Sequence, residues 1–281
     1  MKTTLLISAL AILLIALAIG WLRADDRFPA PASPSLQTIE ETWPALKKQA
    51  SAPEKRELLE TAINQVLREC SSNLLVTNKL QAALTKANDA NPEKALKLLQ
   101  AALKDSEEIL RFRISREAKL PVGFPEPTPL GEIQRKEYPA YRLARAASTK
   151  DSAFFTLFGH IQKNKIEMTA PVEIRYDETN SKYEQIDMAF LYGEPDWGKL
   201  GDAGKGVTVE DIPALTTISI GLSGDYETDL IPYVDALETW LAKNASDHER
   251  DGKVRMMGYN SPFVFKSKRY FEVEIPVKKR K

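Results

Sequence analysis

Residues suited to metal or nucleophile chemistry are scarce in this sequence of 281 residues, which contains two histidines and one cysteine. A neutral imidazole, from His160 or His248, can ligate a metal ion such as iron. A single cysteine allows neither an intrachain disulfide nor a cysteine-based zinc or iron–sulfur site. Cys70 precedes Ser71 and Ser72 in a helical pattern. We therefore interpret it as a small packing residue rather than a nucleophile.

His160 and Met168 are the candidate metal ligands. His160 lies at the edge, not the centre, of an apolar helical stripe at residues 154–161. A half-exposed histidine near a helix end is the alternative interpretation. Met168 offers a soft sulfur ligand, although methionine more often fills a gap in a core. His248 lies in a polar loop, which favours a solvated role.

Cationic and aromatic side chains on the predicted strands could recognise a carboxylate-bearing ligand. Arg175, Arg255 and Lys165 could each pair with a carboxylate through charge-assisted hydrogen bonds. Solvation at the surface is the alternative for all three. Tyr259 and Phe263 either line a cleft or pack against it, and the sequence leaves both interpretations open.

An enzymatic role is not favoured by the carboxylates. Three of them fall on predicted strands: Glu173, Glu184 and Asp187. A carboxylate inside a cleft could act as a general base, but no second motif supports a hydrolase. We therefore expect no enzymatic activity.

The overall charge argues against a general nucleic-acid binder. The 39 Lys and Arg residues are balanced by 39 Asp and Glu residues. Nucleic-acid binding normally requires a basic excess or a basic stripe. The basic tail at 278–281 is interpreted as a solvated terminus.

The N-terminus contains an apolar run without charges at residues 4–22. As a helix it would span roughly 28 Å, close to the thickness of the bilayer hydrocarbon. Residues 1–24 are therefore expected to be a signal anchor, or alternatively a signal peptide with a small-residue cleavage site near 18–20. Both alternatives export the rest of the chain. The expected location is the cell envelope, membrane-anchored or, after cleavage, periplasmic or secreted.

The rest of the chain divides by pattern. Apolar stripes at helical spacing, such as Leu59–Val66 and Leu96–Leu103, predict three or four helices packed as a small bundle or hairpin. This segment could space the domains or bind a protein partner. The expected organisation is a proline-rich linker at 25–35, a helical segment at 36–115, a second proline-rich linker at 116–130, and a domain of strands and helices at 131–281.

The C-terminal domain contains an internal repeat with an offset of 74 residues. Tyr138-Pro139-Ala140-Tyr141 aligns with Ile212-Pro213-Ala214-Leu215, and each stretch runs into a strand pattern. A proline at the same place in both suggests an edge or a bulge within a duplicated strand. An apolar helix follows each, expected at 151–162 and at 225–241, and each expected helix opens near an aspartate.

Two strand-like runs then follow each helix. The runs are expected at Ile166–Tyr176, Tyr183–Tyr192, Val254–Tyr259 and Tyr270–Val277. The unit is therefore β-α-β-β, used twice. The predicted fold class is α+β, with two pseudo-repeats forming a curved or barrel-like antiparallel sheet with two helices, preceded by an N-terminal membrane helix and a small all-α segment. A cleft between the halves is a natural ligand site.

Three stretches in this order resemble the SOUL haem-binding family and the related bacterial effector-binding domains. They are EYPAYRLARA at 137–146, FFTLFGHIQKNKIEMTAPV at 154–172 and VRMMGYNSPFV at 254–264. The resemblance covers 131–277 and leaves the helical segment outside.

The resemblance implies non-enzymatic binding of haem or a related tetrapyrrole, as a carrier, buffer or sensor. The expected ligand-binding residues are His160, Met168, Arg175, Tyr259 and Phe263, with His160 as the candidate ligand of a haem iron. The alternatives are a binding module for other amphipathic small molecules, or a membrane-tethered scaffold that acts through residues 36–115.

Overall fold

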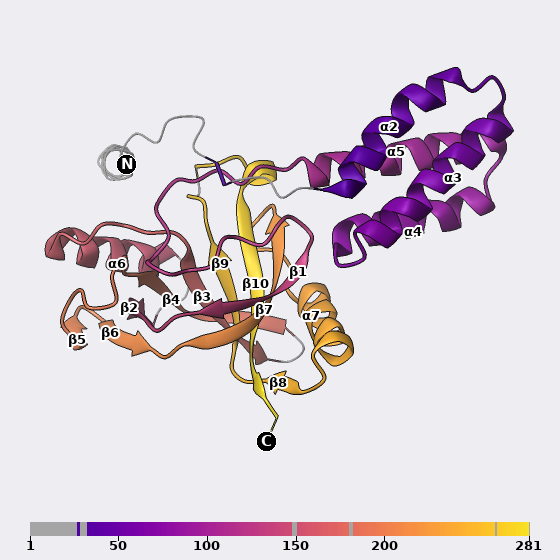
Figure 1. Cartoon of the computed structure of the whole chain (residues 1–281). Helices are drawn as coiled ribbons and strands as arrows, with labels where there is room; N and C mark the ends of the chain where they lie inside the picture. Colours follow the sequence, from indigo (N-terminus) through magenta and orange to yellow (C-terminus); the bar gives the residue numbers. More distant parts are fainter. Residues whose placement is uncertain (1–26, 29–32, 148–150, 180–181, 262, 281) are drawn as a thin grey trace. The chain divides into compact units, whose positions relative to one another are not determined.

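The computed structural model describes residues 27–28, 33–147, 151–179, 182–261 and 263–280. The chain forms two compact units. Of the described residues, one comprises 33–113 and 128–134, and the other comprises 27–28, 114–127 and those from 135 to 280. Figure 1 shows the first as helices and the second as a large sheet with helices beside it.

The helical unit contains four helices, and side chains cap their N-termini. The helices are α2 (Pro34–Lys48), α3 (Ala52–Glu69), α4 (Leu74–Asn88) and α5 (Pro92–Leu110). Ser51 and Glu54 form a reciprocal capping box at the start of α3. The Asn91 side chain accepts from the amide of Lys94 and so caps α5.

The predicted apolar stripes form the core of this unit. Leu59, Ile63, Leu99 and Leu103 are fully buried in one cluster, so the predicted helical bundle is confirmed. Cys70 is buried at its margin, and burial raises the pKa of its thiol. This environment fits the packing role that the sequence indicated.

The described part of the second unit is built on one large sheet with two α-helices and one short 3-10 helix. Its strands are β1 (Ile133–Tyr138), β2 (Tyr141–Ala146), β3 (Val172–Thr179), β4 (Lys182–Leu191), β5 (Gly201–Gly204), β6 (Val207–Ile212), β7 (Leu215–Ser223), β8 (His248–Arg250), β9 (Val254–Gly258) and β10 (Tyr270–Lys279). Its helices are α6 (Asp151–Asn164), α7 (Ile231–Asn244) and the short 3-10 helix η1 (Lys266–Lys268).

The internal repeat is visible in the order of the strands. The sheet runs β1-β7-β10-β9-β3-β4-β2-β6-β5, and β8 pairs with the far end of β10. The strands β9 and β3 form the central pair. On one side of this pair follow β10, β7 and β1, and on the other side follow their repeat equivalents β4, β2 and β6. β1 and β2 begin 74 residues before β6 and β7, which is the offset predicted from the sequence.

The structure corrects how the repeated proline is used. Pro139 and Pro213 do not lie inside strands but between them, at the junctions β1–β2 and β6–β7. At each junction the chain changes partner, because β1 pairs with β7 while β6 pairs with β2. A residue without an amide hydrogen is tolerated there since no ladder bond is required of it.

Three further expectations differ from the structure. Helix α7 begins at Ile231 rather than at Asp225, whose side chain accepts from the amide of Glu227 in the preceding turn. Residues 166–171 are not part of β3, which begins at Val172. The sheet is also open rather than barrel-like, because β1 and β5 end it without pairing with each other.

The two faces of the sheet differ in polarity. Helix α6 lies against β2, β4 and β6, and the ring of Phe154 packs edge-on against Phe190. Helix α7 lies against β7, β8 and β10. Glu173 pairs in register with Ala189, the neighbour of Phe190, so its side chain points to the face opposite α6. The polar site lies on that face.

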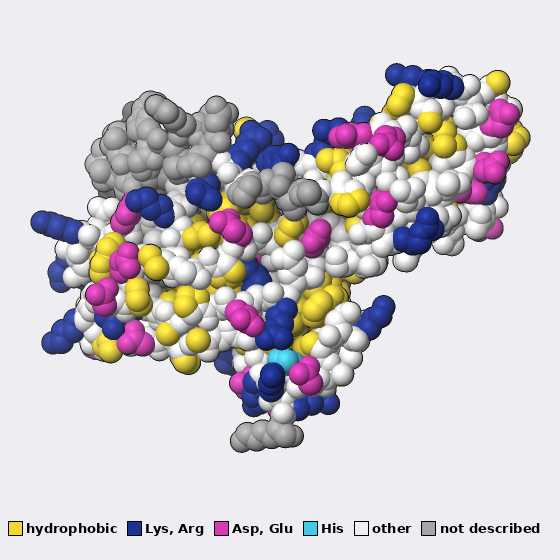
Figure 2. Space-filling model, viewed as in Figure 1, with side chains coloured by type: hydrophobic (Ala, Val, Ile, Leu, Met, Phe, Trp, Pro, Cys, Tyr) yellow, Lys and Arg dark blue, Asp and Glu magenta, His cyan; other side chains and the backbone are white. Residues whose placement is uncertain are grey.

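Within the described residues no helix has the length and apolarity needed to cross a membrane. The apolar run at 4–22 lies outside them, as do all of 1–24 and most of the linker expected at 25–35. On the face drawn in Figure 2, basic and acidic side chains are interspersed.

Candidate functional site

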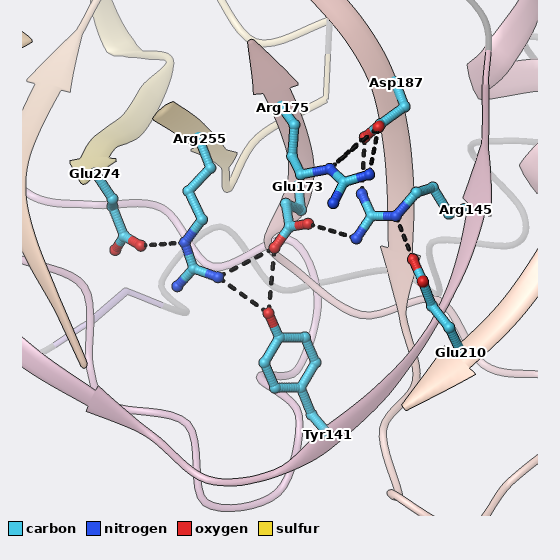
Figure 3. Close-up of polar contacts among 8 residues, drawn as sticks. All are labelled: Tyr141, Arg145, Glu173, Arg175, Asp187, Glu210, Arg255 and Glu274. Carbon is cyan, nitrogen blue, oxygen red and sulfur yellow. Dashed lines mark hydrogen bonds and ion pairs between the residues drawn. The ribbon is translucent and has the colours of Figure 1, made fainter. Parts of the chain in front are cut away.

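The polar face of the sheet holds a connected network of buried arginines and carboxylates. Figure 3 shows its centre, where side chains from β2, β3, β4, β6, β9 and β10 converge. Alternation along each strand places these side chains on one face. The members drawn are Tyr141, Arg145, Glu173, Arg175, Asp187, Glu210, Arg255 and Glu274.

Arg255 on β9 links the two halves of this network. Its Nη1 donates to Oε2 of Glu173 at 3.1 Å and to the hydroxyl of Tyr141 at 3.0 Å. Its Nε donates to Oε2 of Glu274 at 2.7 Å. The second oxygen of Glu274 accepts from the Tyr138 hydroxyl at 2.6 Å. Arg255 is therefore held between two buried carboxylates on neighbouring strands.

Arg145 on β2 makes the corresponding links in the other half. Its Nη1 donates to Oδ1 of Asp187 at 2.7 Å and its Nη2 to Oε1 of Glu173 at 3.0 Å, while its Nε pairs with Glu210. Asp187 also accepts a hydrogen bond from Arg175, whose Nη2 lies 2.6 Å from Oδ2. Glu173 is thus shared by two arginines that come from opposite sides.

A second buried ion pair extends the network along β10. Lys136 Nζ lies 2.7 and 2.9 Å from the two carboxylate oxygens of Glu272. The Tyr259 hydroxyl donates to the same carboxylate at 2.6 Å. Both charged side chains are almost completely buried, and such a pair is tolerated in a core only because each charge is paired and hydrogen-bonded.

The electrostatics of Glu173 follow from its neighbours. Burial alone would raise the pKa of this carboxyl, but the guanidinium groups of Arg255 and Arg145 outweigh burial and hold its pKa below the usual range. Burial raises the pKa of the Tyr141 hydroxyl, and the neighbouring Glu173 carboxylate raises it further. At neutral pH the site therefore contains ionised Glu173 and protonated Tyr141.

A cleft of about 860 Å³ opens onto this network, within the range of roughly 300–1,000 Å³ typical of small-molecule sites. Its floor includes Arg145, Glu173, Arg175 and Arg255. Its walls come from both repeat junctions and from β10. The wall residues without charge are Tyr138, Tyr141, Ile212, Pro213, Ala214, Leu215, Thr216, Gly252, Pro276 and Val277.

One polar atom of the cleft floor has no partner. Arg255 Nη2 is buried and forms no hydrogen bond among the described residues. The guanidinium plane lies over the ring of Tyr138, with its central carbon 4.5 Å from the ring centroid. Leaving a buried donor of a charged group unsatisfied is costly, so this nitrogen is suited to bind an acceptor supplied by a ligand.

The segment before β1 packs beside the cleft. The ring of Phe124 makes edge contacts with Tyr138 and Tyr141, with centroids 5.1 and 5.0 Å apart. The proline-rich stretch 116–130 was predicted as a linker. Its residues up to 127 belong to the sheet unit, so this part helps to position the two wall tyrosines.

His160, the candidate iron ligand, lies away from the cleft on α6. Its Nε2 is 2.7 Å from the Tyr192 hydroxyl, and the two rings are nearly parallel. Burial, and to a lesser extent Lys163, lowers the pKa of His160. The imidazole is therefore neutral at pH 7, but iron ligation through Nε2 would require it to leave Tyr192.

The five residues predicted as ligand-binding are not brought together. Arg175 lines the cleft. Tyr259 is buried against Glu272, Met168 is half-buried just before β3, and Phe263 is exposed after β9. Their role in ligand binding stays a prediction, and the structure supplies a cleft only for Arg175.

Sequence reasoning missed Arg145 and Glu274 as members of the site. A signal existed in each case. Arg145 stands between two alanines in β2, and Glu274 alternates with Val273 and Ile275 in the last strand. Alternation shows that one face is polar, but it does not show whether that face meets solvent or a buried network.

This architecture defines a duplicated α+β binding domain with a cleft between its halves. The family model described as "SOUL heme-binding protein" matches residues 126–276, more than half of the chain. The chain belongs to the SOUL haem-binding protein family. The resemblance stated from the sequence motifs is thereby confirmed. No curated protein gives a significant match.

Solved structures similar to this chain include the C-terminal domain of EcmrR, at 17% identity over 53% of this chain and 98% of that one, with a TM-score of 0.41. A hydrolase from Listeria innocua is 12% identical over 54% of this chain and 94% of its own, with a TM-score of 0.41. SAV2435 bound to tetraphenylphosphonium is 10% identical over 52% and 94%, with a TM-score of 0.31.

Proposed function

We propose that the cleft binds haem or a related tetrapyrrole, with a carboxylate of the ligand paired to Arg255 and Arg175. The observation that carries the proposal is the buried, unpartnered Nη2 of Arg255 in the floor of the cleft. A carboxylate forms strong, charge-assisted hydrogen bonds with a guanidinium donor. Membership of the SOUL haem-binding family supports the class of ligand.

The walls fit the rest of such a molecule. Ile212, Leu215 and Val277 supply aliphatic surface, and Tyr138 and Tyr141 supply aromatic surface. A tetrapyrrole combines a flat apolar ring with carboxylate arms, and the cleft offers apolar and aromatic walls beside the guanidinium groups of Arg175 and Arg255. Burial of the ring between the walls would contribute most of the affinity, since apolar burial is worth about 25 cal/mol per Å².

The cleft would hold the ring without a strong bond to its iron. Among the described residues that line the cleft there is no histidine, cysteine or methionine. The raised pKa of Tyr141 keeps its hydroxyl protonated, and a protonated phenol is a poor iron ligand. The residues present therefore fit the ring and its carboxylates, whereas iron ligation would depend on His160 outside the cleft.

The proposed role is binding rather than catalysis. The carboxylate best placed to act as a base, Glu173, is tied to Arg145 and Arg255, and its lowered pKa makes it a weak base. No group of three or more potential metal-ligating side chains occurs in the part of the chain that the structure describes. We further propose that residues 4–22 tether the protein to a membrane, so that it acts as an envelope carrier, buffer or sensor.

A haemin titration of the full-length protein in detergent tests this proposal. We expect a Soret band that saturates near one equivalent. Arg175→Gln should weaken binding about tenfold, which corresponds to ~1.4 kcal/mol. Arg250→Gln is the matched control, because Arg250 is also ion-paired, to Glu238, but does not line the cleft. A featureless titration without saturation would overturn the proposal.

His160→Ala separates the cleft from the alternative site on α6. Binding in the cleft predicts an unchanged affinity for this variant. If His160→Ala abolishes the Soret band while Arg175→Gln leaves it intact, the ligand binds at α6 and the cleft proposal is wrong.

A further inference from the structure

The turn between β9 and β10 exposes two large aromatic side chains. Phe263 is 58% exposed and Phe265 is 82% exposed. Two exposed lysines, Lys266 and Lys268, follow them directly in η1. We call Phe263–Lys268 the aromatic loop. Exposed apolar side chains are informative when they gather in one place, and here two phenylalanines and two lysines fall within the six residues 263–268.

The aromatic loop is held in place by backbone contacts. The amides of Lys268 and Arg269 donate to the Phe265 carbonyl at 2.8 and 3.0 Å. Arg269 Nη2 donates to the Val264 carbonyl at 3.2 Å. Lys266 is paired with Asp225. The exposure of both phenylalanines therefore belongs to an ordered turn.

Tyr259 and Asn260, which precede the aromatic loop, contact Phe28 and Ser115. The ring of Phe28 packs edge-on against Tyr259, with centroids 6.3 Å apart. The amide of Phe28 donates to the Ile114 carbonyl at 3.0 Å, and the next carbonyl, that of Ser115, accepts from the Asn260 side chain at 3.0 Å. Residues 28, 114–115 and 259–260 thus form one edge of the unit.

That edge must lie near the membrane if residues 4–22 span it. Five residues, 23–27, connect Leu22 to Phe28 in six Cα–Cα steps. A fully extended chain covers at most ~3.6 Å per step, or roughly 22 Å in all. Phe28 is therefore confined to within about that distance of the bilayer surface, and the aromatic loop is attached beside it.

We propose that the aromatic loop is a second membrane contact, which docks the sheet unit onto a bilayer containing anionic phospholipid. Phenylalanine side chains can insert at the boundary between headgroups and acyl chains, while the exposed Lys268 attracts anionic headgroups at the surface. A bilayer interface accepts exposed aromatic side chains without a preformed pocket. This inference rests on the proposed membrane tether but not on tetrapyrrole binding.

The test places a fluorophore on the loop of the full-length protein in lipid nanodiscs. Phe265→Cys is labelled with an environment-sensitive dye, because the native Cys70 is buried and reacts poorly. Glu249→Cys is the control. Glu249 is exposed and pairs in register with Lys278, eight residues along β10 from Tyr270, or about 26 Å from the loop.

We expect lipids with a quencher in the acyl chain to quench the label at 265 several-fold more than the label at 249. The quenching at 265 should fall when anionic lipid is replaced by zwitterionic lipid. Phe263→Cys serves as a second position in case labelling at 265 disturbs the turn. Equal quenching at 249 and at both loop positions would overturn the proposal. That result would favour a protein partner for the loop and would leave the haemin titration unaffected.

Discussion

Glu173 and Arg255 occupy equivalent positions in the two halves of the repeat and form an ion pair across the middle of the sheet. Each is the second residue of its strand, β3 or β9, and Arg255 Nη1 lies 3.1 Å from Glu173 Oε2. In the register of β3 and β9, Ile174 lies opposite Met256. Glu173 precedes Ile174 on one strand and Arg255 precedes Met256 on the other, so the two charged side chains lie diagonally across the strand pair. The two halves thus carry opposite charges at one equivalent position, and the ion pair between these charges joins them.

Glu173→Gln should destabilise the sheet unit by about 1.5–3 kcal/mol, because a neutral amide replaces the carboxylate that Arg145 and Arg255 share. Each arginine keeps another carboxylate partner. Chemical denaturation at pH 7 measures the loss. Glu184→Gln is the control, since Glu184 is exposed on the adjacent strand β4. A loss below about 0.5 kcal/mol, the range of ordinary surface changes, would contradict the structural importance of the pair.

The contribution of Glu173 should also depend on pH. Its pKa in the folded protein is lowered from 4.5, so the folded state favours the ionised form and the stabilisation is fully present above that value. It is lost as the pH falls from 4.5 through the lower folded pKa. The stability difference between wild type and Glu173→Gln should therefore shrink in acid, and a difference that grows below pH 4.5 would have the wrong sign.

Lys136→Met should cost about 3–5 kcal/mol, because it leaves the buried carboxylate of Glu272 without its cation. The double variant Lys136→Met with Glu272→Met should recover most of this loss, since a buried ion pair can often be replaced by apolar side chains of similar size. Part of the loss should remain, because the Tyr259 hydroxyl then lacks its acceptor. Thermal unfolding of the three proteins measures these differences.

Metal-free protoporphyrin should bind within about threefold of haemin, or ~0.7 kcal/mol, if the cleft grips the ring and its carboxylates. Fluorescence titration measures the porphyrin and absorbance titration measures haemin. Haemin binding more than about tenfold tighter would instead show that an iron ligand contributes, and the preference should then disappear in His160→Ala.

Leu99→Ala should destabilise the helical unit by about 2–5 kcal/mol, because it opens a cavity at a fully buried position. Lys97→Ala on the same helix is exposed and should change stability by less than about 0.5 kcal/mol. The haemin titration should be the same for both variants, since the cleft is formed only by residues of the sheet unit. Weaker haemin binding by Leu99→Ala alone would show that the helical unit takes part in binding.

Much of the architecture was determined by local patterns in the sequence. The stripes around Leu59 and Leu99 are periodic within single helices, so they identified the bundle without knowledge of its packing. The repeated motif at Tyr138 and Ile212 predicted two equivalent units with an offset of 74, and the strand boundaries follow that offset. The family motifs, which lie in the same region, were sufficient to indicate the SOUL family.

Only the tertiary structure decided what the polar side chains do. Glu274 and Arg145 are far apart in sequence, and no local pattern shows that β10 and β2 present them to the same face. The first strand of each repeat pairs with the other half: β1 with β7, and β6 with β2. This pairing is equally non-local, because the partner of a strand depends on long-range contacts and not on the strand's own residues alone. The cleft and its unpartnered Arg255 nitrogen therefore arise from assembly of the sheet.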